Sequence, residues 1–292
     1  MKSAFISIIG RPSSGKSTLV NAVCRNKVSI VSPIPQTTRN KIRGIYTDTA
    51  RGQLIFIDTP GYNISERKFN HYLKQIVYYT LDESDMVLYM IDSTRTPGEE
   101  EKAIVQLLKA TKKTITIALN KIDRNPDYAE QYCTSLEQNF PGAKVFKISA
   151  LSRTGVDKLI AYLLENAPDG ELYYPEEYYT DQLPEFRISE IIREKVINQT
   201  RDEVPHSVYV EILDMEMKND GNTLWVRAMI NVERESQKGI IIGKDGKVIK
   251  LIKNLALKEI TPLFPYEIDL DLRVKVNYKW RRKEHLISRI LK

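Results

Sequence analysis

Residues 4–24 read AFISIIGRPSSGKSTLVNAVC: an apolar run, a turn that contains glycines, and an amphipathic run. The turn, from Gly10 to Ser17, fits the pattern G-x-x-x-x-G-K-[S/T], and a strand before it and a helix after it are the context in which that pattern binds phosphate. Glycines let backbone N–H groups turn toward phosphate oxygens, and the N-terminus of the helix adds a positive dipole. We therefore predict a phosphate-binding loop in which Lys16 reaches the terminal phosphates and Ser17 ligates Mg²⁺. The alternative is a chance match in a glycine-containing turn.

Short β-rich runs alternate with helical patterns over residues 1–168, which we predict to form one domain. Runs such as MVLYMID and TITIALN are almost continuously apolar, as strands buried on both faces are. The alternation predicts a doubly wound, mostly parallel α/β sheet of the P-loop type with helices on both faces. The predicted strands are 4–9, 54–58, 86–92, 114–120 and 143–149, and the predicted helices include 68–82, 99–111 and 156–166.

Composition predicts an ordinary soluble protein of the reducing cytosol. Apolar residues make up 42% and charged residues 28% of the 292 positions, and no apolar run approaches the roughly 18 residues that a membrane-spanning helix needs. The start, MKSAFISIIG, lacks a cleavage-site pattern, so we interpret it as a core strand and not as a signal peptide. Cys24 and Cys133 show no metal-ligand or redox spacing. The net charge of +6 indicates a polyanionic partner.

Residues 169–186 differ in composition from the sequence on either side. They contain six acids, four tyrosines and two prolines but no Lys or Arg, and we predict a linker between domains. Beyond it, residues 187–292 show a helix at about 187–200, two strands joined through 219–222, a helical region around 240–258, a strand at about 267–277 and a short basic helix. This order predicts a second, smaller α+β domain.

Two motifs that follow predicted strands point to a guanine nucleotide. Asn120-Lys121-Ile122-Asp123 ends the 114–120 strand, at the carboxyl edge where parallel sheets bind ligands. The Asp123 carboxylate can accept hydrogen bonds from the ring N–H and the exocyclic amine of guanine, whereas adenine presents a lone pair at that ring nitrogen. Ser149-Ala150-Leu151 ends the next strand, where a backbone N–H can reach the guanine oxygen. We therefore predict a site for GTP and GDP.

The Mg²⁺ site is predicted from two further segments. Asp58-Thr59-Pro60-Gly61 ends the 54–58 strand, where an acidic residue holds Mg²⁺ in P-loop proteins. Gly61 can offer its N–H to a γ-phosphate and lets the segment move when that phosphate leaves. Upstream, Gln36-Thr37-Thr38-Arg39 lies in a polar segment, and a threonine there can complete the Mg²⁺ shell in the triphosphate state. The alternative is that these threonines belong to an ordinary loop.

Residues 240–250, IIIGKDGKVIK, carry two glycines three positions apart inside a helical pattern. Glycine costs roughly 1 kcal/mol relative to alanine in a helix interior, so the pair indicates a break between two helices. A G-x-x-G loop lets a nucleic-acid backbone approach closely, and this is the device of KH domains, which clamp about four nucleotides of single strand. Six lysines and one acid between Lys238 and Lys258 favour RNA. The alternative is that one glycine caps the end of a helix and the other lies in the following turn, with the lysines on a solvated face.

The C-terminal residues are strongly basic. Residues 273–292 hold eight Lys or Arg against Glu284 alone, which favours contact with RNA over a merely solvated helix. Trp280 lies among these charges, and the sequence leaves open whether it stacks on a base or packs the last helix.

In this order, the motifs GRPxxGKS, PQTTR, DTPG, NKID and SAL, followed by a tail that carries G-K-D-G, resemble the Era family of bacterial ribosome-assembly GTPases. The resemblance covers essentially the whole chain. It implies an N-terminal GTPase domain with slow, Mg²⁺-dependent hydrolysis of GTP and a C-terminal type II KH domain. It also implies that the KH domain binds 16S ribosomal RNA near its 3′ end, in assembly of the 30S subunit.

The resemblance assigns roles to the residues at matching positions. GTP or GDP is assigned to Gly10, Arg11, Pro12, Ser13, Ser14, Gly15, Lys16, Ser17, Thr18, Asp58, Thr59, Pro60, Gly61, Tyr62, Asn120, Lys121, Asp123, Ser149, Ala150 and Leu151. Catalysis is assigned to Lys16, Thr38, Asp58 and Gly61, and Mg²⁺ to Ser17, Thr38 and Asp58. RNA is assigned to Ile242, Gly243, Lys244, Asp245, Gly246, Lys247, Lys250, Arg281 and Arg282.

Two positions bear on hydrolysis. The family's P-loops usually read GRPNVGKS. In related GTPases that asparagine is associated with a K⁺ ion that stands in for an arginine finger. Ser13 occupies this position here, so a role for K⁺ stays open. Tyr62 stands where Ras-like proteins place a water-orienting glutamine after DxxG, and family relatives also lack a glutamine there. No side chain therefore stands out as the group that orients the water.

Three classes of function remain in competition. The first is a monomeric, cytoplasmic GTPase switch on ribosomal RNA, and the sequence leaves open whether it also associates peripherally with the inner membrane. The second is a GTPase of RNA modification or membrane transport, but neither a catalytic cysteine nor a membrane helix is visible in the sequence. The third is an RNA-binding protein with a degenerate nucleotide fold, which the intact Lys16, Ser17, Asp58 and Asp123 disfavour.

Overall fold

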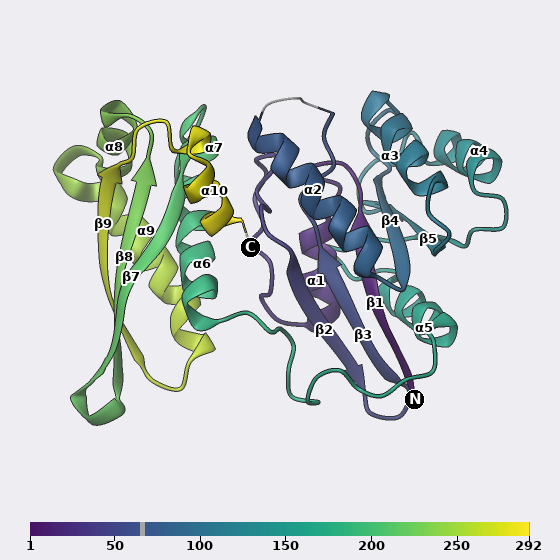
Figure 1. Ribbon diagram of the computed structural model, residues 1–292, viewed down its shortest axis with the longest axis horizontal. Coiled ribbons are helices and arrows are strands. Elements are labelled where there is room, and N and C mark those ends of the chain that lie inside the picture. The colour runs from purple at the N-terminus through teal and green to yellow at the C-terminus, as the bar shows by residue number, and fades with distance from the viewer. Residues whose placement is uncertain (65–67, 292) are drawn as a thin grey trace. The chain divides into compact units, whose positions relative to one another are not determined.

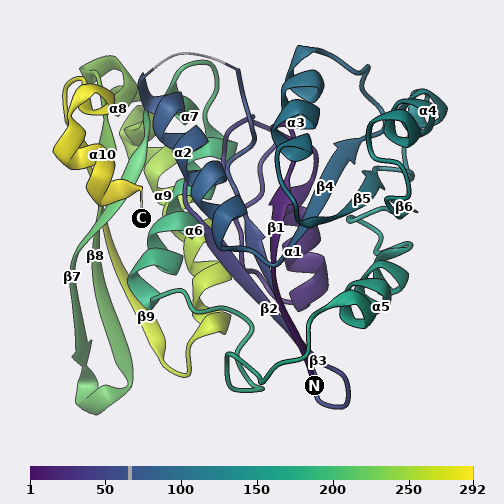
Figure 2. The same cartoon turned by 45° about the vertical axis from the view of Figure 1, so that its right-hand side comes forward.

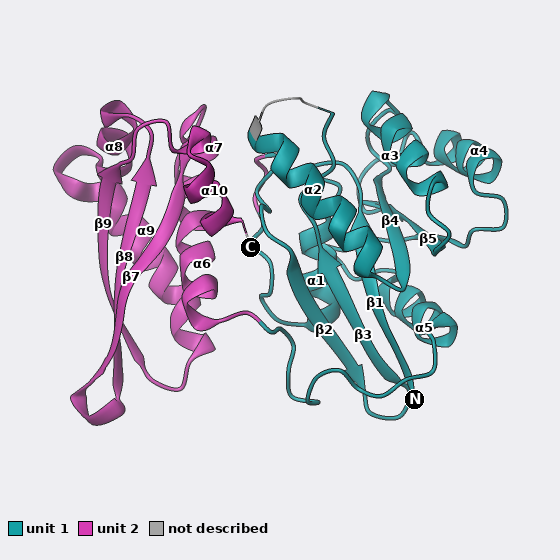
Figure 3. Ribbon diagram, viewed as in Figure 1, with its two compact units in different colours: residues 1–31, 35–181 teal, residues 32–34, 182–292 magenta. Residues whose placement is uncertain are grey.

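The computed structural model describes residues 1–64 and 68–291, and the chain divides into two compact units (Figure 3). The first unit comprises Met1–Val31 and Pro35–Asp181, and the second comprises Ser32–Ile34 and Gln182–Lys292. The short segment Ser32–Ile34 is thus grouped with residues far from it in sequence. Lys292, one of the eight basic residues of the tail, lies outside the described residues.

The first unit is built on a six-stranded sheet with the order β2-β3-β1-β4-β5-β6 (Figures 1 and 2). The strands are β1 (Lys2–Ile9), β2 (Ile42–Asp48), β3 (Gly52–Asp58), β4 (Met86–Asp92), β5 (Thr114–Asn120) and β6 (Val145–Lys147). Only β2 runs antiparallel, against β3. The mostly parallel α/β sheet is confirmed. The edge strand β2 was not predicted, because its mixed sequence IRGIYTD lacks the continuous apolarity of the buried strands.

Helices cover both faces of this sheet (Figure 2). They are α1 (Lys16–Cys24), α2 (Lys68–Glu83), α3 (Glu99–Lys109), α4 (Ala129–Asn139) and α5 (Val156–Asn166). Apolar side chains of α2, α3 and α4 form one core cluster with β1, β4 and β5, and it includes Tyr62 and Tyr89. Helices α1 and α5 contact β1–β3. Helix α4 was not predicted, because its sequence AEQYCTSLEQN buries only three of eleven residues.

Residues 169–181, which belong to the predicted linker, lie against β2 and β3 of the first unit. The N–H of Ile45 donates to the Tyr179 carbonyl at 3.0 Å, and the Thr180 hydroxyl donates to the Arg43 carbonyl at 2.8 Å. Asp181 forms an ion pair with Arg43 at 2.7 Å. Residues 169–181 therefore form an extended strap along the β2 edge of the sheet.

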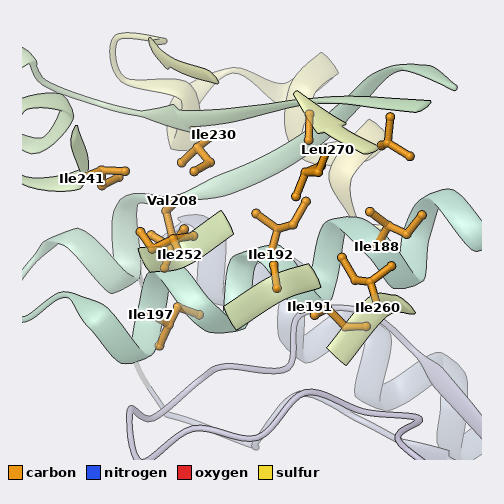
Figure 4. Close-up of a cluster of buried hydrophobic side chains, with 14 of the residues drawn as sticks. Ile188, Ile191, Ile192, Ile197, Val208, Ile230, Ile241, Ile252, Ile260 and Leu270 are labelled. Carbon is orange, nitrogen blue, oxygen red and sulfur yellow. The ribbon is translucent and has the colours of Figure 1, made fainter. Parts of the chain in front are cut away.

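The second unit is a three-stranded sheet with the order β7-β8-β9 and five α-helices in its described part. The strands are β7 (Tyr209–Lys218), β8 (Thr223–Val232) and β9 (Glu267–Val276); β8 pairs antiparallel with β7 and parallel with β9. The helices are α6 (Pro184–Gln199), α7 (Val204–Ser207), α8 (Glu235–Ile242), α9 (Lys247–Ile260) and α10 (Glu284–Ile290). The smaller α+β domain is thus confirmed. Its core joins side chains of the sheet to α6, α8 and α9, among them Ile192, Ile241, Ile252 and Leu270 (Figure 4).

Trp280 packs the end of the chain. Its side chain is fully buried, its indole N–H donates to the Ser207 carbonyl at 2.7 Å, and its ring meets Tyr209 edge-on at 4.8 Å between centroids. The structure thus decides between the two alternatives for this residue in favour of packing. Within the described ranges, no helix combines the length and apolarity needed to cross a bilayer.

Candidate functional site

The sequence motifs of the first unit meet at one edge of its sheet. In the strand register Ile8 lies beside Asp58, Ile9 beside Tyr89, and Asp92 beside Asn120. The loops that leave β1, β3, β4 and β5 therefore start at the same edge, as expected for the carboxyl ends of parallel strands.

The loop after β1 needs its glycines for two different reasons. A Cβ on Gly10 would lie 2.2 Å from the Met90 carbonyl oxygen, so the strand β4 excludes any side chain there. Gly15 has φ +101°, and its Cβ would lie 2.2 Å from the Asn120 amide nitrogen. Gly15 directly precedes α1, so the unpaired backbone N–H groups of the first turn of that helix lie at this loop.

Asn120 connects the phosphate-binding loop to the Ser149–Leu151 segment. Its amide donates to the Ser14 carbonyl at 2.8 Å, and its carbonyl accepts from the N–H of Ala150 at 2.9 Å. Asn120 therefore positions both loops. The Ala150 N–H is thus already bonded within the protein, and the Leu151 side chain beside it is exposed.

Lys16 is buried inside the loop that precedes it. Its ammonium donates to the carbonyls of Gly10 at 3.1 Å and Arg11 at 2.9 Å. Burial lowers the pKa of Lys16 to about 8, although the nearby Asp58 and Glu101 carboxylates favour its charged form. Phosphate oxygens in the loop would add negative charge beside the ammonium and hold it protonated.

The three residues expected at Mg²⁺ lie together. The Ser17 hydroxyl donates to Asp58 Oδ2 at 2.6 Å and lies 2.9 Å from the Thr38 hydroxyl, which in turn lies 3.4 Å from Asp58 Oδ2. Asp58 is fully buried, and burial raises its pKa against the opposing effect of Lys16. Its Oδ1 has no hydrogen-bond partner among the described residues. A buried carboxylate oxygen without a partner, next to two hydroxyls, fits the oxygen ligands that Mg²⁺ prefers.

The segment after β3 packs against the phosphate-binding loop. A Cβ on Gly61 would lie 2.5 Å from the Cα of Pro12, so only glycine fits. The neighbouring polar groups serve the fold: the Thr59 hydroxyl donates to the Ile8 carbonyl at 2.7 Å, and the Tyr62 N–H donates to the Gly10 carbonyl at 3.1 Å. The Tyr62 ring is buried in the core, which raises its pKa to about 12. Two side chains assigned to the nucleotide, Thr59 and Tyr62, therefore lie in the protein interior.

Two positively charged side chains at this edge of the sheet form ion pairs with carboxylates that lie outside the motifs. Arg11 binds Glu100 at 2.9 Å and Glu101 at 3.6 Å, at the start of α3. Lys121 binds Asp92 at 2.6 Å. The signals in the sequence were the acidic run 99–101 and the aspartate that ends β4, both of which the sequence reasoning missed. Other members of the expected nucleotide set are Asp123, which is exposed after β5, and Pro60 and Ser149, which are buried.

The G-K-D-G loop of the second unit is open. Helix α8 ends at Ile242, Gly243 (φ +70°) and Gly246 (φ +72°) flank a short turn, and α9 begins directly afterwards. A Cβ on Gly243 would lie 2.4 Å from Val248, whereas no described atom lies within 4 Å of the corresponding position on Gly246. Lys244, Asp245, Lys247 and Lys250 are exposed, as are the apolar side chains of Ile240 and Leu251 on either side.

The two arginines assigned to RNA differ in environment. Arg281 binds Glu233 through an ion pair at 2.5 Å, while Arg282 is exposed. Arg281 therefore holds the end of β8 to the C-terminal segment, and Arg282 presents its guanidinium to solvent.

Comparison with known proteins identifies this architecture. A family described as 50S ribosome-binding GTPase matches residues 5–121, and the KH domain family matches residues 203–281. GTPase Era of Treponema denticola is 48% identical over 293 residues, which cover 99% of each chain. GTPase Era of Borreliella afzelii is 47% identical over 292 residues and the whole of both chains. The chain belongs to the Era family of GTPases.

Solved Era structures share the whole fold. A crystal structure of Era in complex with MgGDPNP and nucleotides 1506–1542 of 16S ribosomal RNA superposes with a TM-score of 0.95 at 34% identity, over 99% of this chain and 98% of that one. Era of Aquifex aeolicus, as a Tyr-to-Ala variant bound to GDP·AlF4⁻, gives a TM-score of 0.94 at 34% identity, over 99% of both chains. As a member of the Era family, the protein is a GTP hydrolase, and its C-terminal unit is a KH domain.

Proposed function

We propose that this protein is a GTPase switch that binds single-stranded 16S ribosomal RNA near its 3′ end and acts in assembly and maturation of the 30S subunit. The observation that carries the proposal is the chain-long similarity to Era crystallised with MgGDPNP and 16S nucleotides 1506–1542. In this proposal residues 1–168 hydrolyse GTP to GDP and phosphate, and residues 187–292 bind RNA. Residues 169–186 link these two domains.

The nucleotide would be held by the loop between β1 and α1. Backbone N–H groups from Ser13 to Ser17 and the Lys16 ammonium would bind the phosphates, and the Asp123 carboxylate would read guanine. Ser17, Thr38 and Asp58 would hold Mg²⁺, which when bound neutralises charge on the β- and γ-phosphates. The packing of Gly61 against Pro12 supports a role for its N–H at the γ-phosphate end of the loop.

The RNA would bind at the G-K-D-G loop. Absence of a Cβ at Gly243 and Gly246 lets a sugar–phosphate backbone approach, and Lys244, Lys247 and Lys250 supply positive charge. The open space around Gly246 supports this arrangement. The exposed Ile240 and Leu251 offer apolar surface to unstacked bases, and Arg282 adds charge.

We further propose that the protein works as a monomer in the cytoplasm. Its net charge of +6 suits contact with ribosomal RNA, and the same charge would favour a peripheral contact with the anionic inner membrane. With Ser13 in place of the family's asparagine, K⁺ would have fewer side-chain ligands at the phosphates.

Two measurements on the purified protein test the proposal. In filter binding at fixed salt, an RNA with the 3′-terminal sequence of 16S ribosomal RNA should bind more tightly than an RNA of the same composition in scrambled order. Hydrolysis of GTP should require Mg²⁺ and should exceed hydrolysis of ATP. Equal binding of both RNAs would contradict the RNA assignment, and loss of GTP preference would favour an RNA-binding protein with a degenerate nucleotide fold.

A further inference from the structure

The water that attacks the γ-phosphate of a GTPase needs a polar group to orient it. The residue directly after Gly61 does not supply one here. The Tyr62 ring lies in the core between α2 and the sheet, and its hydroxyl lies 3.4 Å from that of Tyr78. Its backbone N–H is used by the Gly10 carbonyl. The orienting group therefore has to come from another residue.

Gln36 lies in the segment that precedes Thr38. It lines a groove together with Gly61, Tyr62 and Asn63 and with four residues of α2: Asn70, Leu73, Lys74 and Val77. Gly61 in turn packs against Pro12 of the phosphate-binding loop. The groove thus adjoins the end of that loop where the γ-phosphate is expected.

The backbone at Gln36 is held in an unusual conformation. Its φ of +62° lies in the left-handed region, which residues with a side chain seldom adopt. Two residues later, the Thr38 hydroxyl lies 2.9 Å from Ser17. Backbone strain of this kind persists where the surrounding structure enforces it, and it concentrates at functional sites. The turn at Gln36 therefore places a neutral amide side chain two residues before the residue expected at Mg²⁺.

We propose that Gln36 orients the hydrolytic water of this GTPase, which rests on the GTP hydrolysis proposed above. The Gln36 carbonyl would accept a hydrogen bond from the water, and its amide would donate to a γ-phosphate oxygen. The water oxygen forms a bond to the γ-phosphorus while the bond from that phosphorus to the β–γ bridging oxygen breaks. The bridging oxygen leaves with the electron pair as GDP, and the water proton ends on inorganic phosphate. Gln36 positions these groups and takes no proton.

The test uses Gln36→Ala and Gln36→Gly, with Asn70→Ala as the matched control. The glycine variant removes the side chain but adopts the left-handed backbone without strain. It therefore distinguishes the effect of losing the amide from the effect of changing the backbone conformation. Asn70 shares the groove and is largely buried on α2. Single-turnover hydrolysis gives the rate, titration gives the Kd for GTP and GDP, and trapping with GDP and aluminium fluoride reports assembly of the transition-state geometry.

Both Gln36 variants should hydrolyse GTP about 100-fold more slowly, as expected when one positioned polar group is lost from a transition state. They should bind GTP and GDP within about twofold of the wild type and lose the aluminium fluoride complex. Asn70→Ala should keep the rate. Wild-type rates in Gln36→Gly, or loss of GTP affinity without loss of rate, would overturn the inference. If the wild type itself failed to hydrolyse GTP, the proposed function would fail instead.

Discussion

Each unit places a left-handed glycine directly before a helix, but the surroundings of the two glycines differ. Gly15 (φ +101°) precedes α1, and a Cβ there would collide with Asn120 at 2.2 Å. Gly246 (φ +72°) precedes α9, and no described atom lies within 4 Å of its Cβ position. Packing against Asn120 therefore excludes any side chain at position 15. At position 246 only the left-handed backbone conformation favours glycine.

The contrast extends to the polar groups around each loop. In the first unit, Lys16, Ser17 and Asn120 are already hydrogen-bonded to protein atoms that shape the loop. In the second unit, Lys244 and Lys247 are exposed beside the turn. A closed cradle suits a small ligand of fixed shape, because its donors are preorganised. An open loop suits a polymer that has to pass across the surface.

The largest expected effect separates the two glycines directly. Gly15→Ala should lower affinity for GTP and GDP by more than about 100-fold, because the new methyl group displaces Asn120 and with it both loops that Asn120 joins. Gly246→Ala should leave nucleotide affinity unchanged and cost only about 1–2 kcal/mol of stability, the cost of a left-handed alanine. Nucleotide titration and denaturant unfolding measure both effects.

Gly221→Ala is the matched control for the second glycine. Gly221 has φ +90° and equally open surroundings, but it lies in the turn between β7 and β8. Gly221→Ala should lower the free energy of unfolding by about as much as Gly246→Ala does. Gly221→Ala should keep its affinity for RNA, whereas Gly246→Ala should weaken RNA binding. Equal RNA affinity in the two variants would show that the open space at Gly246 has no role in recognition.

Base recognition should depend on Asp123. Asp123→Asn should lower the affinity for GTP by about 100-fold or more, because the amide cannot accept hydrogen bonds from both guanine donors. Xanthosine triphosphate should bind the variant better than GTP does, since its extra carbonyl can accept from the new amide. Competition titrations with the two nucleotides check this, and unchanged GTP affinity would remove Asp123 from the site.

The buried Lys16 should make nucleotide binding depend on pH. With a pKa of about 8 in the free protein, Lys16 is charged at pH 7 and partly neutral at pH 8.5. Phosphates favour the charged form, so binding above pH 8 takes up a proton, and affinity should fall as pH rises, by at most about tenfold per unit. Calorimetry of GDP binding in buffers of different ionisation enthalpy measures that uptake, which should be larger at pH 8.5 than at pH 7.5, where Lys16 is mostly charged. Absence of proton uptake at pH 8.5 would contradict the buried environment of Lys16.

The smallest expected effect concerns K⁺. Ser13 has a shorter side chain than asparagine and no amide carbonyl, so we expect K⁺ to stimulate hydrolysis less in the wild type than in Ser13→Asn. The ratio of GTPase rates in K⁺ and Na⁺, measured for both proteins, should be a few-fold larger in the variant. A strong K⁺ preference in the wild type would show that backbone carbonyls suffice.

The sequence predicted the elements whose patterns are local. Continuous apolar runs identified β1, β3, β4 and β5, and the glycine motifs identified the starts of α1 and α9. The sequence did not predict β2, α4 or the strap formed by residues 169–181, because each depends on contacts with distant residues and not on its own periodicity. Edge strands and exposed helices carry weak hydrophobic patterns, so their sequences are ambiguous.

The site shows the same division. The motifs and the resemblance to the Era family predicted that Ser17, Thr38 and Asp58 would lie near one metal, and their side chains do lie within hydrogen-bond distance of one another. The burial of Thr59 and Tyr62 side chains, and the clamp of Glu100 and Glu101 on Arg11, arise from tertiary packing that no motif encodes. The same is true of Trp280, whose buried partner Ser207 is 73 residues away.

RNA binding by Lys244→Asp tests most directly whether the G-K-D-G loop is the RNA site, and Lys112→Asp is a control of equal charge change. Lys244 lies in the open loop, whereas Lys112 is an exposed residue between α3 and β5. Filter binding of the 16S 3′-terminal RNA at fixed salt should show a large loss for Lys244→Asp and little loss for Lys112→Asp, because two adjacent aspartates repel the phosphates that position the RNA. Stability should change by no more than about 0.5 kcal/mol, and GTP affinity should be unchanged. Wild-type RNA affinity in Lys244→Asp would show that the RNA site lies elsewhere and that the glycines only separate two helices.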